Sequence, residues 1–292
     1  MTVHTIYRTQ TGKKRIQQYY EDYLTAFPKD LERQHVDIRF GSTHVLVSGP
    51  SDGKPVFVFQ GGNCINPMTL SWFTGLFQDY RVYAPDTIGH PGYSAETRIS
   101  AKDDSFALWI RDLMDHFGIE QSAFIGPSYG AGIILRLAAF QPERIACSIL
   151  VSPSGMTLGS IPKMIRCILL PMLRYRLTSS EKALAQIADA MSCGTMKSRD
   201  AEIIGEIFKS VRLEQEMPKI TGKKELERYG APTLVIAGSH DIFFPANKVI
   251  QAAHRIMTTP ETEVFPMGHF PSDIEILQIN DRIKTFLESN YT

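Results

Sequence analysis

The stretch FIGPSYGAG at positions 124–132 constrains the fold of this chain more than any other part of the sequence. It lies between an apolar run typical of a buried strand, residues 122–125, and an apolar helical run, residues 133–140. A Gly-x-Ser-x-Gly pattern at such a junction predicts a sharp strand-to-helix turn that holds Ser128 in a strained conformation and points its hydroxyl out of the sheet. Side chains at Gly126 and Gly130 would collide with the neighbouring elements. The pattern also arises by chance, and a serine becomes a nucleophile only beside a base and an acid.

Two later loops supply candidates for that acid and that base. Asp241 follows an apolar strand-like run over residues 232–238, and His269 follows the last predicted strand, over residues 262–266. Because the carboxyl ends of parallel strands meet at one edge of a sheet, we expect Ser128, Asp241 and His269 to converge there. Taken singly, His269 is equally well explained as a turn residue, and Asp241 is better explained as a helix cap. Together they predict a catalytic triad, in which His269 accepts the serine proton and Asp241 orients the imidazole.

A backbone site for an oxyanion is predicted beside the serine. The apolar run over residues 55–59 is followed by Gly61 and Gly62, and two adjacent glycines allow close approach of the backbone. An acyl-transfer enzyme needs N–H donors around the developing oxyanion, and we assign these to Tyr129 and Gly62, with Asn63 as the next candidate. An ordinary Gly-Gly turn is the alternative interpretation.

Strand and helix patterns alternate along most of the chain, which predicts an α/β fold with a mainly parallel sheet. A helix over about 13–27 comes first, and helical segments follow one another without a strand over residues 156–218. We therefore expect a core domain of residues 1–155 and 219–292, with residues 156–218 inserted as a helical cap over the edge of the sheet where the serine emerges. A helical bundle that only enlarges the core is the alternative.

Candidate substrate-binding residues come from the glycine-rich loop, the cap and the turn after the histidine. They are Gly61, Cys64, Met164, Leu169, Met172 and Phe270. The apolar side chains of the cap predict a small, largely apolar and uncharged substrate. No residue-level code links them to a particular acyl group.

The charge balance disfavours several classes of partner. Lys+Arg and Asp+Glu both number 31, so no net field attracts nucleic acid or an anionic membrane, although a local patch is compatible with this balance. No apolar run is long enough to span a membrane and the start lacks a signal peptide, which predicts a cytoplasmic protein. The four cysteines lack Cys-x-x-Cys spacing, which predicts free thiols and no metal site. The oligomeric state stays open.

On these motifs the chain resembles the α/β-hydrolase-fold superfamily, and within it the carboxylesterase-like serine hydrolases with a helical cap. The resemblance covers roughly residues 36–288 and rests on residues 60–63, 86–94, 126–130, 238–241 and 268–269. It implies an eight-stranded sheet, a hydrolase without a cofactor, and catalytic roles for Ser128, Asp241 and His269. Gln60 departs from the histidine that the family commonly has there. Dehalogenases and epoxide hydrolases of this fold carry an aspartate where this chain has Ser128.

We therefore expect hydrolysis of a carboxylic ester, or of a similar acyl bond such as a thioester or lactone, through an acyl-Ser128 intermediate. Three alternatives are left open by the sequence. The same triad could act on a C–C bond or on an amide or peptide bond, or in cofactor-free perhydrolysis. The fold could also serve as a ligand-binding protein without turnover.

Overall fold

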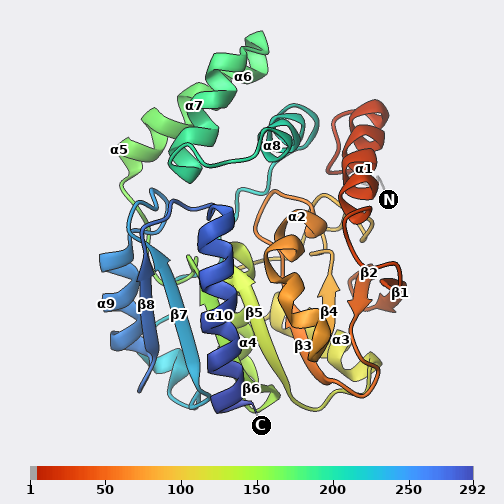
Figure 1. The fold of residues 1–292 in the computed structure, drawn as a ribbon, viewed down its shortest axis with the longest axis vertical. Coiled ribbons are helices and arrows are strands. Elements are labelled where there is room, and N and C mark those ends of the chain that lie inside the picture. Colours follow the sequence, from red (N-terminus) through yellow and green to blue (C-terminus); the bar gives the residue numbers. More distant parts are fainter. Residues whose placement is uncertain (1–4, 292) are drawn as a thin grey trace.

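An eight-stranded sheet forms the centre of the protein in a computed structural model that describes residues 5–291 (Figure 1). Its strand order is β1-β2-β4-β3-β5-β6-β7-β8. The pairs β1–β2 and β2–β4 are antiparallel, and the remaining pairs are parallel. The strands are β1 (Glu32–Ile38), β2 (Gly41–Ser48), β3 (Lys54–Val58), β4 (Tyr80–Pro85), β5 (Ser122–Pro127), β6 (Ile145–Val151), β7 (Thr233–Gly238) and β8 (Glu261–Phe265). The predicted α/β class and mainly parallel sheet are confirmed.

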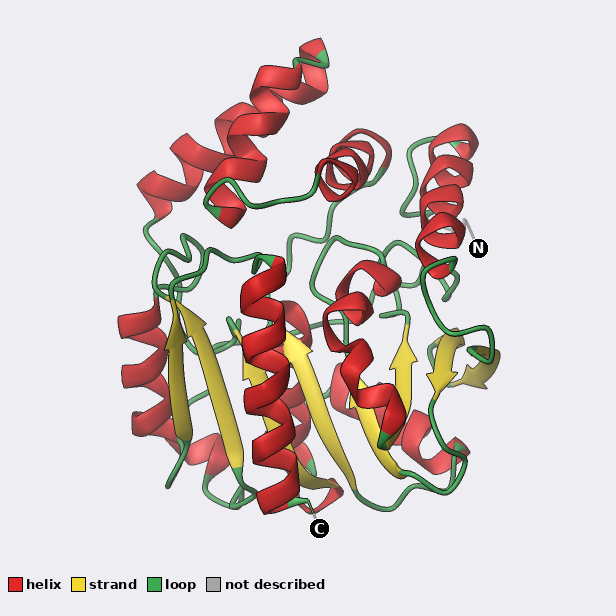
Figure 2. Ribbon diagram, in the orientation of Figure 1, coloured by secondary structure: helices red, strands yellow, loops and turns green. Residues whose placement is uncertain are grey.

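Helices cover both faces of this sheet (Figure 2). They are α2 (Asn66–Leu70), α3 (Ser105–His116), α4 (Tyr129–Phe140), α9 (Ala246–Ile256) and α10 (Asp273–Asn290), with the 3₁₀ segment η1 (Ser71–Gln78) after α2. Side chains alternate along a strand, so each strand serves two cores. Val58 of β3 belongs to the core that contains Phe286 of α10, whereas its neighbour Phe57 packs in the core that contains Trp109 of α3 and Ile133 of α4.

A group of helices occupies the chain between β6 and β7 and lies above the carboxyl ends of the strands (Figure 1). It comprises α5 (Ile161–Met164), the π-helical turn η3 (Ile165–Leu169), α6 (Leu170–Thr178), α7 (Glu181–Ser192) and α8 (Ser198–Ser210). Within residues 5–291, no helix is both long enough and apolar enough to cross a membrane.

The N-terminal helix α1 (Gln10–Leu24) begins and ends earlier than the predicted range of about 13–27. Thr9 caps its start, since the Thr9 hydroxyl accepts a hydrogen bond from the N–H of Gly12 at 3.0 Å. The helix lies beside α8, where the Tyr23 hydroxyl donates to Asp200 at 2.8 Å. Phe27 is buried in the turn after the helix, so its apolar character extended the helical pattern beyond the true end.

Candidate active site

Ser128 occupies the predicted turn between β5 and α4. Its backbone has φ 52° and ψ −114°, a conformation that side chains rarely adopt. A Cβ atom at Gly126 would lie 2.5 Å from the carbonyl carbon of Gly130, and one at Gly130 would lie 2.8 Å from the carbonyl oxygen of Phe59. Both distances are too short for real contacts. Glycine is therefore required on each side of the serine, as the sequence predicted.

Asp241 and His269 meet beyond the ends of β7 and β8. Nδ1 of His269 lies 2.8 Å from Oδ2 of Asp241, whose side chain is fully buried. The other oxygen, Oδ1, accepts hydrogen bonds from the N–H groups of Phe243 at 2.8 Å and Phe244 at 3.1 Å. Burial alone would raise the pKa of Asp241, but the imidazole of His269 and the two backbone donors outweigh it and lower the pKa. The carboxylate is therefore ionised at neutral pH and can hold Nδ1 protonated.

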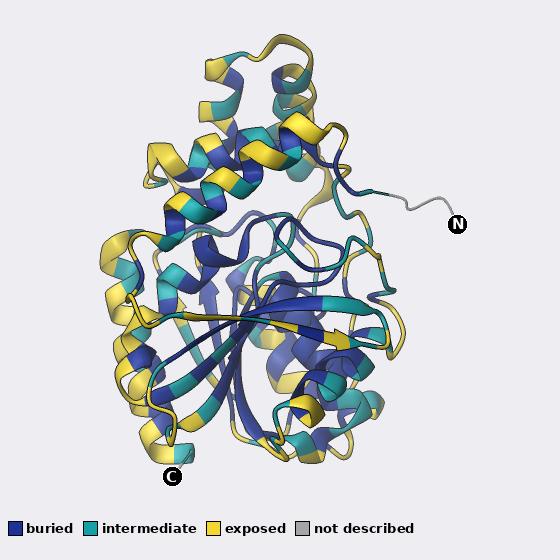
Figure 3. Ribbon diagram, turned by 90° about the vertical axis from the view of Figure 1, so that its right-hand side faces the viewer, coloured by how far each residue is buried: buried dark blue, intermediate teal, exposed yellow. Residues whose placement is uncertain are grey.

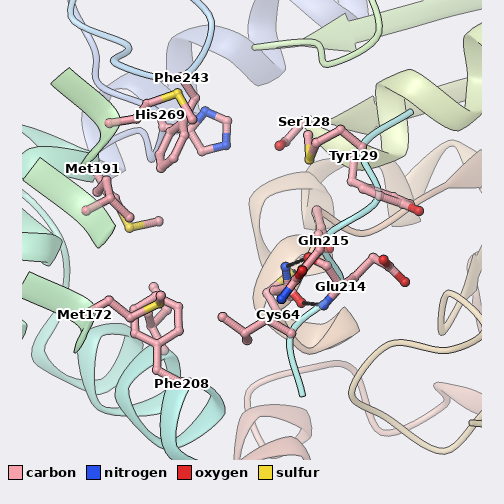
Figure 4. A pocket seen from close by; sticks show the side chains of 18 of the residues that line it. Cys64, Ser128, Tyr129, Met172, Met191, Phe208, Glu214, Gln215, Phe243 and His269 are labelled. Carbon is pink, nitrogen blue, oxygen red and sulfur yellow. Dashed lines mark hydrogen bonds between the residues drawn. The ribbon is translucent and has the colours of Figure 1, made fainter. Parts of the chain in front are cut away.

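Ser128 and His269 line the same cavity (Figure 4). In that view the Ser128 side chain and the imidazole lie on facing sides of one end of the cavity. The rings of Phe243 and Phe244 lie 4.8 and 5.6 Å from the imidazole centroid and fix its orientation. This leaves Nε2, the nitrogen that does not contact Asp241, for the serine or a substrate. The three side chains that the sequence analysis proposed as a triad thus lie at one edge of the sheet.

The two peptide groups proposed as oxyanion donors are neighbours. A Cβ atom at Gly62 would lie 3.2 Å from Cβ of Tyr129, and both residues line the cavity. Among the described residues, neither the N–H of Gly62 nor that of Tyr129 has a hydrogen-bond acceptor. Asn63 has φ 52°, and its side chain is engaged elsewhere, donating to the carbonyl of Glu214 at 3.0 Å and accepting from its N–H at 2.7 Å. Only the backbone of Asn63 is therefore free for an oxyanion.

Gln60, the departure from the family pattern, is fully buried and joins two loops. Its Nε2 donates to the carbonyl of Cys64 at 2.8 Å, and its Oε1 accepts from the N–H of Thr87 at 3.1 Å. The amide thus donates to the loop that carries Gly62 and accepts from the loop after β4. These two hydrogen bonds of Gln60 hold the glycine-rich loop against the loop after β4.

The cavity has a volume of about 890 Å³ and extends from Ser128 towards α6, α7 and α8. All the substrate-binding candidates of the sequence analysis contribute to its wall, namely Gly61, Cys64, Met164, Leu169, Met172 and Phe270. Their placement is as expected, and their role in substrate binding stays a prediction. Cys64 is not a second nucleophile, because burial raises the pKa of its thiol to about 11. The described cysteines are free thiols, as predicted.

The cavity wall also contains residues that the sequence analysis did not name. The apolar ones include Trp72, Met191, Ile204, Phe208, Phe243 and Phe244. Phe243 and Phe244 stand two and three residues after Asp241, so their position close to the acid was the available signal. Four arginines line the cavity as well, namely Arg8, Arg98, Arg176 and Arg212. Arg98 pairs with Glu214 at 3.4 Å. No sequence motif marks these charged residues.

Two other buried histidines lie outside the cavity wall. His90 packs its ring 4.8 Å from that of Tyr129, and burial lowers its pKa to about 4. His44 contacts Asp86 at 3.1 Å, and Asp86 also accepts from the hydroxyl of Tyr20 at 2.7 Å. This second Asp-His pair is fully buried. It therefore holds β2 against the loop after β4 and has no access to a substrate.

The sequence profile of the family described as alpha/beta hydrolase fold matches residues 54–275. The chain therefore belongs to the α/β hydrolase fold family, as the motifs predicted. It is similar to carboxylesterase YbfK of Bacillus subtilis, with 24% identity over 282 residues that cover 94% of this chain and 93% of YbfK. The crystal structure of YbfK superimposes with a TM-score of 0.78 at 21% identity, covering 95% of this chain and 98% of that one.

Two further relatives add to this comparison. The uncharacterized carboxylesterase nap of Bacillus subtilis is 25% identical over 287 residues, which cover 94% of this chain and 93% of nap. A shorter match, 36% identical over 112 residues, links 36% of this chain to 38% of 2-hydroxymuconate semialdehyde hydrolase of Pseudomonas putida. Family membership and the likeness to carboxylesterases over nearly the whole chain identify this protein as a carboxylesterase-like hydrolase.

Proposed function

We propose that the protein hydrolyses carboxylic esters, or similar acyl bonds such as thioesters and lactones, through an acyl-Ser128 intermediate. The observation that carries this proposal is the 2.8 Å contact between Nδ1 of His269 and buried Asp241 at the cavity end that also holds Ser128. The relatives YbfK and nap are carboxylesterases, which agrees with this chemistry.

In the acylation step, Oγ of Ser128 attacks the acyl carbon while its proton passes to Nε2 of His269. The carbonyl electron pair moves to oxygen, where the N–H groups of Gly62 and Tyr129 stabilise the new charge, with the Asn63 N–H as a further candidate. Asp241 stays ionised and stabilises the imidazolium, in accord with its lowered pKa. Cleavage of the ester C–O bond then releases the alcohol, which takes the proton from His269.

Deacylation repeats these roles with water as the nucleophile. His269 accepts a proton from water as its oxygen adds to the acyl carbon, and the same N–H groups stabilise the second oxyanion. The acid then leaves and Oγ of Ser128 regains its proton. The ester and one water molecule balance the two halves of the reaction, with the proton taken from water returning from His269 to Oγ as the bond between Oγ and the acyl carbon breaks.

We also propose that residues 156–218 act as a cap domain on a core of residues 1–155 and 219–292. This proposal is supported by Met164, Leu169 and Met172, which contribute to the cavity wall from α5, η3 and α6. The cap would then set substrate length, while the core supplies the reacting groups. In this proposal the substrate contacts Gly61, Cys64 and Phe270 on the side of the core domain.

Hydrolysis of a C–C bond is the second candidate, because the local similarity to 2-hydroxymuconate semialdehyde hydrolase is the highest in identity of the relatives described above. The two candidates share Ser128, Asp241 and His269 and differ in the bond that is cleaved. Turnover of 2-hydroxymuconate semialdehyde by the wild type, without cleavage of p-nitrophenyl esters, would favour the C–C candidate.

The test is hydrolysis of a chain-length series of p-nitrophenyl esters by the wild type, Ser128→Ala and the control Ser239→Ala. Ser239 is an exposed serine near Asp241 and has no place in the proposed mechanism. We expect Ser128→Ala to lose activity by about 10⁶-fold in kcat, and Ser239→Ala to keep it. A fluorophosphonate probe should modify Ser128 alone. Full ester-cleaving activity in Ser128→Ala would refute the proposal.

A further inference from the structure

The helix formed by α5, η3 and α6 exposes a continuous row of large apolar side chains. Ile161, Ile165, Leu169, Leu173 and Leu177 follow one another at intervals of four residues, and they are 63, 41, 46, 51 and 77% exposed. Residues four apart form a ridge on a helix surface. Single exposed apolar residues are ordinary, but a contiguous row marks an interaction site. We call these five residues the apolar ridge.

The adjacent row of the same helix faces inward. Met164, Ile168, Met172 and Arg176 are also spaced by four, and they line the cavity that contains Ser128. Leu169 of the apolar ridge lines the cavity too. One helix therefore separates the cavity from solvent, with its apolar surface continuous from the cavity wall to the outside. Exposed residues are prominent on the helices at the top of the molecule (Figure 3).

The charge on this helix has one sign. Residues 156–180 contain Lys163, Arg166, Arg174 and Arg176 and no aspartate or glutamate. Among the ion pairs of residues 5–291, none includes any of these four cations. The whole chain is neutral, so this is a local excess of positive charge beside an exposed apolar row.

These properties discriminate between the possible occupants of the apolar ridge. Arg176 lines the cavity, whereas Lys163, Arg166 and Arg174 do not. A second copy packed ridge to ridge would bring these three cations towards the same three cations, and this repulsion opposes the contact. A bilayer with anionic lipids accepts the apolar side chains and pairs with the cations at the same time. The helix is about 27 Å long at 1.5 Å per residue, and it would lie along the surface without spanning the membrane. We propose that residues 161–178 are a docking surface for an anionic lipid bilayer.

Docking in this orientation places the cavity next to the source of apolar substrates. An acyl chain leaving the bilayer passes from the apolar ridge to the cavity wall at Leu169 without crossing open water. Membrane docking is separate from ester hydrolysis, because vesicle binding uses Leu173, Leu177, Arg166 and Arg174 and does not require Ser128.

The experiment is cosedimentation of the full chain with sucrose-loaded vesicles of phosphatidylcholine, alone or mixed with phosphatidylglycerol. We expect the wild type to pellet with the anionic vesicles and to be released as salt is raised. Arg166→Gln combined with Arg174→Gln should weaken binding about 25-fold, since each cation near a membrane surface contributes about fivefold. Leu173→Glu combined with Leu177→Glu should weaken it by about tenfold or more.

Matched controls separate docking from general effects. Ile274→Glu with Leu277→Glu changes two apolar residues on α10 that are 70 and 67% exposed, and should leave vesicle binding unchanged. Ser128→Ala should bind like the wild type, so failure of the proposed ester chemistry would be distinguishable from failure of docking. The arginine variant and the salt titration leave the apolar residues intact and decide the question if the leucine variant does not fold.

Three results would overturn the proposal. The wild type could stay in the supernatant with anionic vesicles, or the leucine variant could bind as well as the α10 control. In the third, sedimentation equilibrium without vesicles would show a dimer that Leu173→Glu with Leu177→Glu dissociates, while vesicles capture no protein. That outcome would assign the apolar ridge to self-association.

Discussion

Replacing Ser128 by glycine should make the protein inactive and more stable than replacing it by alanine. The backbone at residue 128 has φ 52° and ψ −114°, close to the conformation that glycine adopts at the first central position of a type II′ turn. A side chain held in such a region costs about 1–3 kcal/mol. Alanine keeps this strain and glycine removes it, while both lack the hydroxyl. The stability of Ser128→Gly is therefore compared with that of Ser128→Ala and not with that of the wild type.

The expected difference follows from two opposing terms. Glycine loses more backbone entropy on folding than alanine, which costs about 0.5–1 kcal/mol and offsets part of the released strain. The remainder is about 1 kcal/mol in favour of Ser128→Gly, or about 1.6 °C in Tm for a chain of this length. Urea unfolding of the two variants, followed by circular dichroism, measures the difference directly. A Ser128→Gly protein that is less stable than Ser128→Ala would refute the view that this turn stores strain.

Three further predictions concern the acid, the buried histidine and the turn. Asp241→Asn should lower kcat for p-nitrophenyl acetate by about 10⁴-fold with little change in KM, because the amide no longer holds His269 in the reactive tautomer; a loss expressed mainly in KM would contradict this. Gly130→Ala should lower the free energy of unfolding by about 1–3 kcal/mol, measured by urea denaturation, because its Cβ would lie 2.8 Å from the carbonyl oxygen of Phe59. The pKa of His90 falls from 6.5 to about 4 on folding, so the unfolded chain binds more protons between these values. The free energy of unfolding is therefore unaffected by this titration above pH 6.5. It falls by about 3 kcal/mol as the pH is lowered from 6.5 to 4. His90→Gln should not show this decrease when urea unfolding is measured as a function of pH. If the free energy of unfolding falls equally in the wild type and in His90→Gln, the predicted effect of His90 is wrong.

The sheet and the convergence of the candidate triad were predictable because they depend on local patterns and one topological rule. Most strands contain a short apolar run, and Ser128, Asp241 and His269 each follow a strand-like segment. In a parallel sheet this is sufficient to bring them to one edge. The steric need for Gly126 and Gly130 is likewise local, because the turn itself creates the close contacts.

Elements without a regular period could not be predicted in this way. Helix α2 is five residues long with a proline in its first turn, and η1 has a kink at Phe73, so neither presents a helical repeat. The charged part of the cavity depends on contacts between distant segments. Arg8 reaches the cavity because Tyr7 pairs with Val211 in an isolated bridge, which no local pattern of either segment indicates.

The contact between Asn63 and Glu214 links the cavity wall to the loop of the proposed oxyanion donors, which bears on substrate selectivity. Its two hydrogen bonds join the loop that carries Gly62 to the segment leading back from α8. A ligand that displaces this segment must either break both bonds, at about 1 kcal/mol each, or pull Asn63 along with it. Under the proposed oxyanion role of the Gly62 N–H, fit at the cavity wall and stabilisation of the transition state would be thermodynamically coupled. A badly fitting substrate would then be penalised in turnover as well as in affinity.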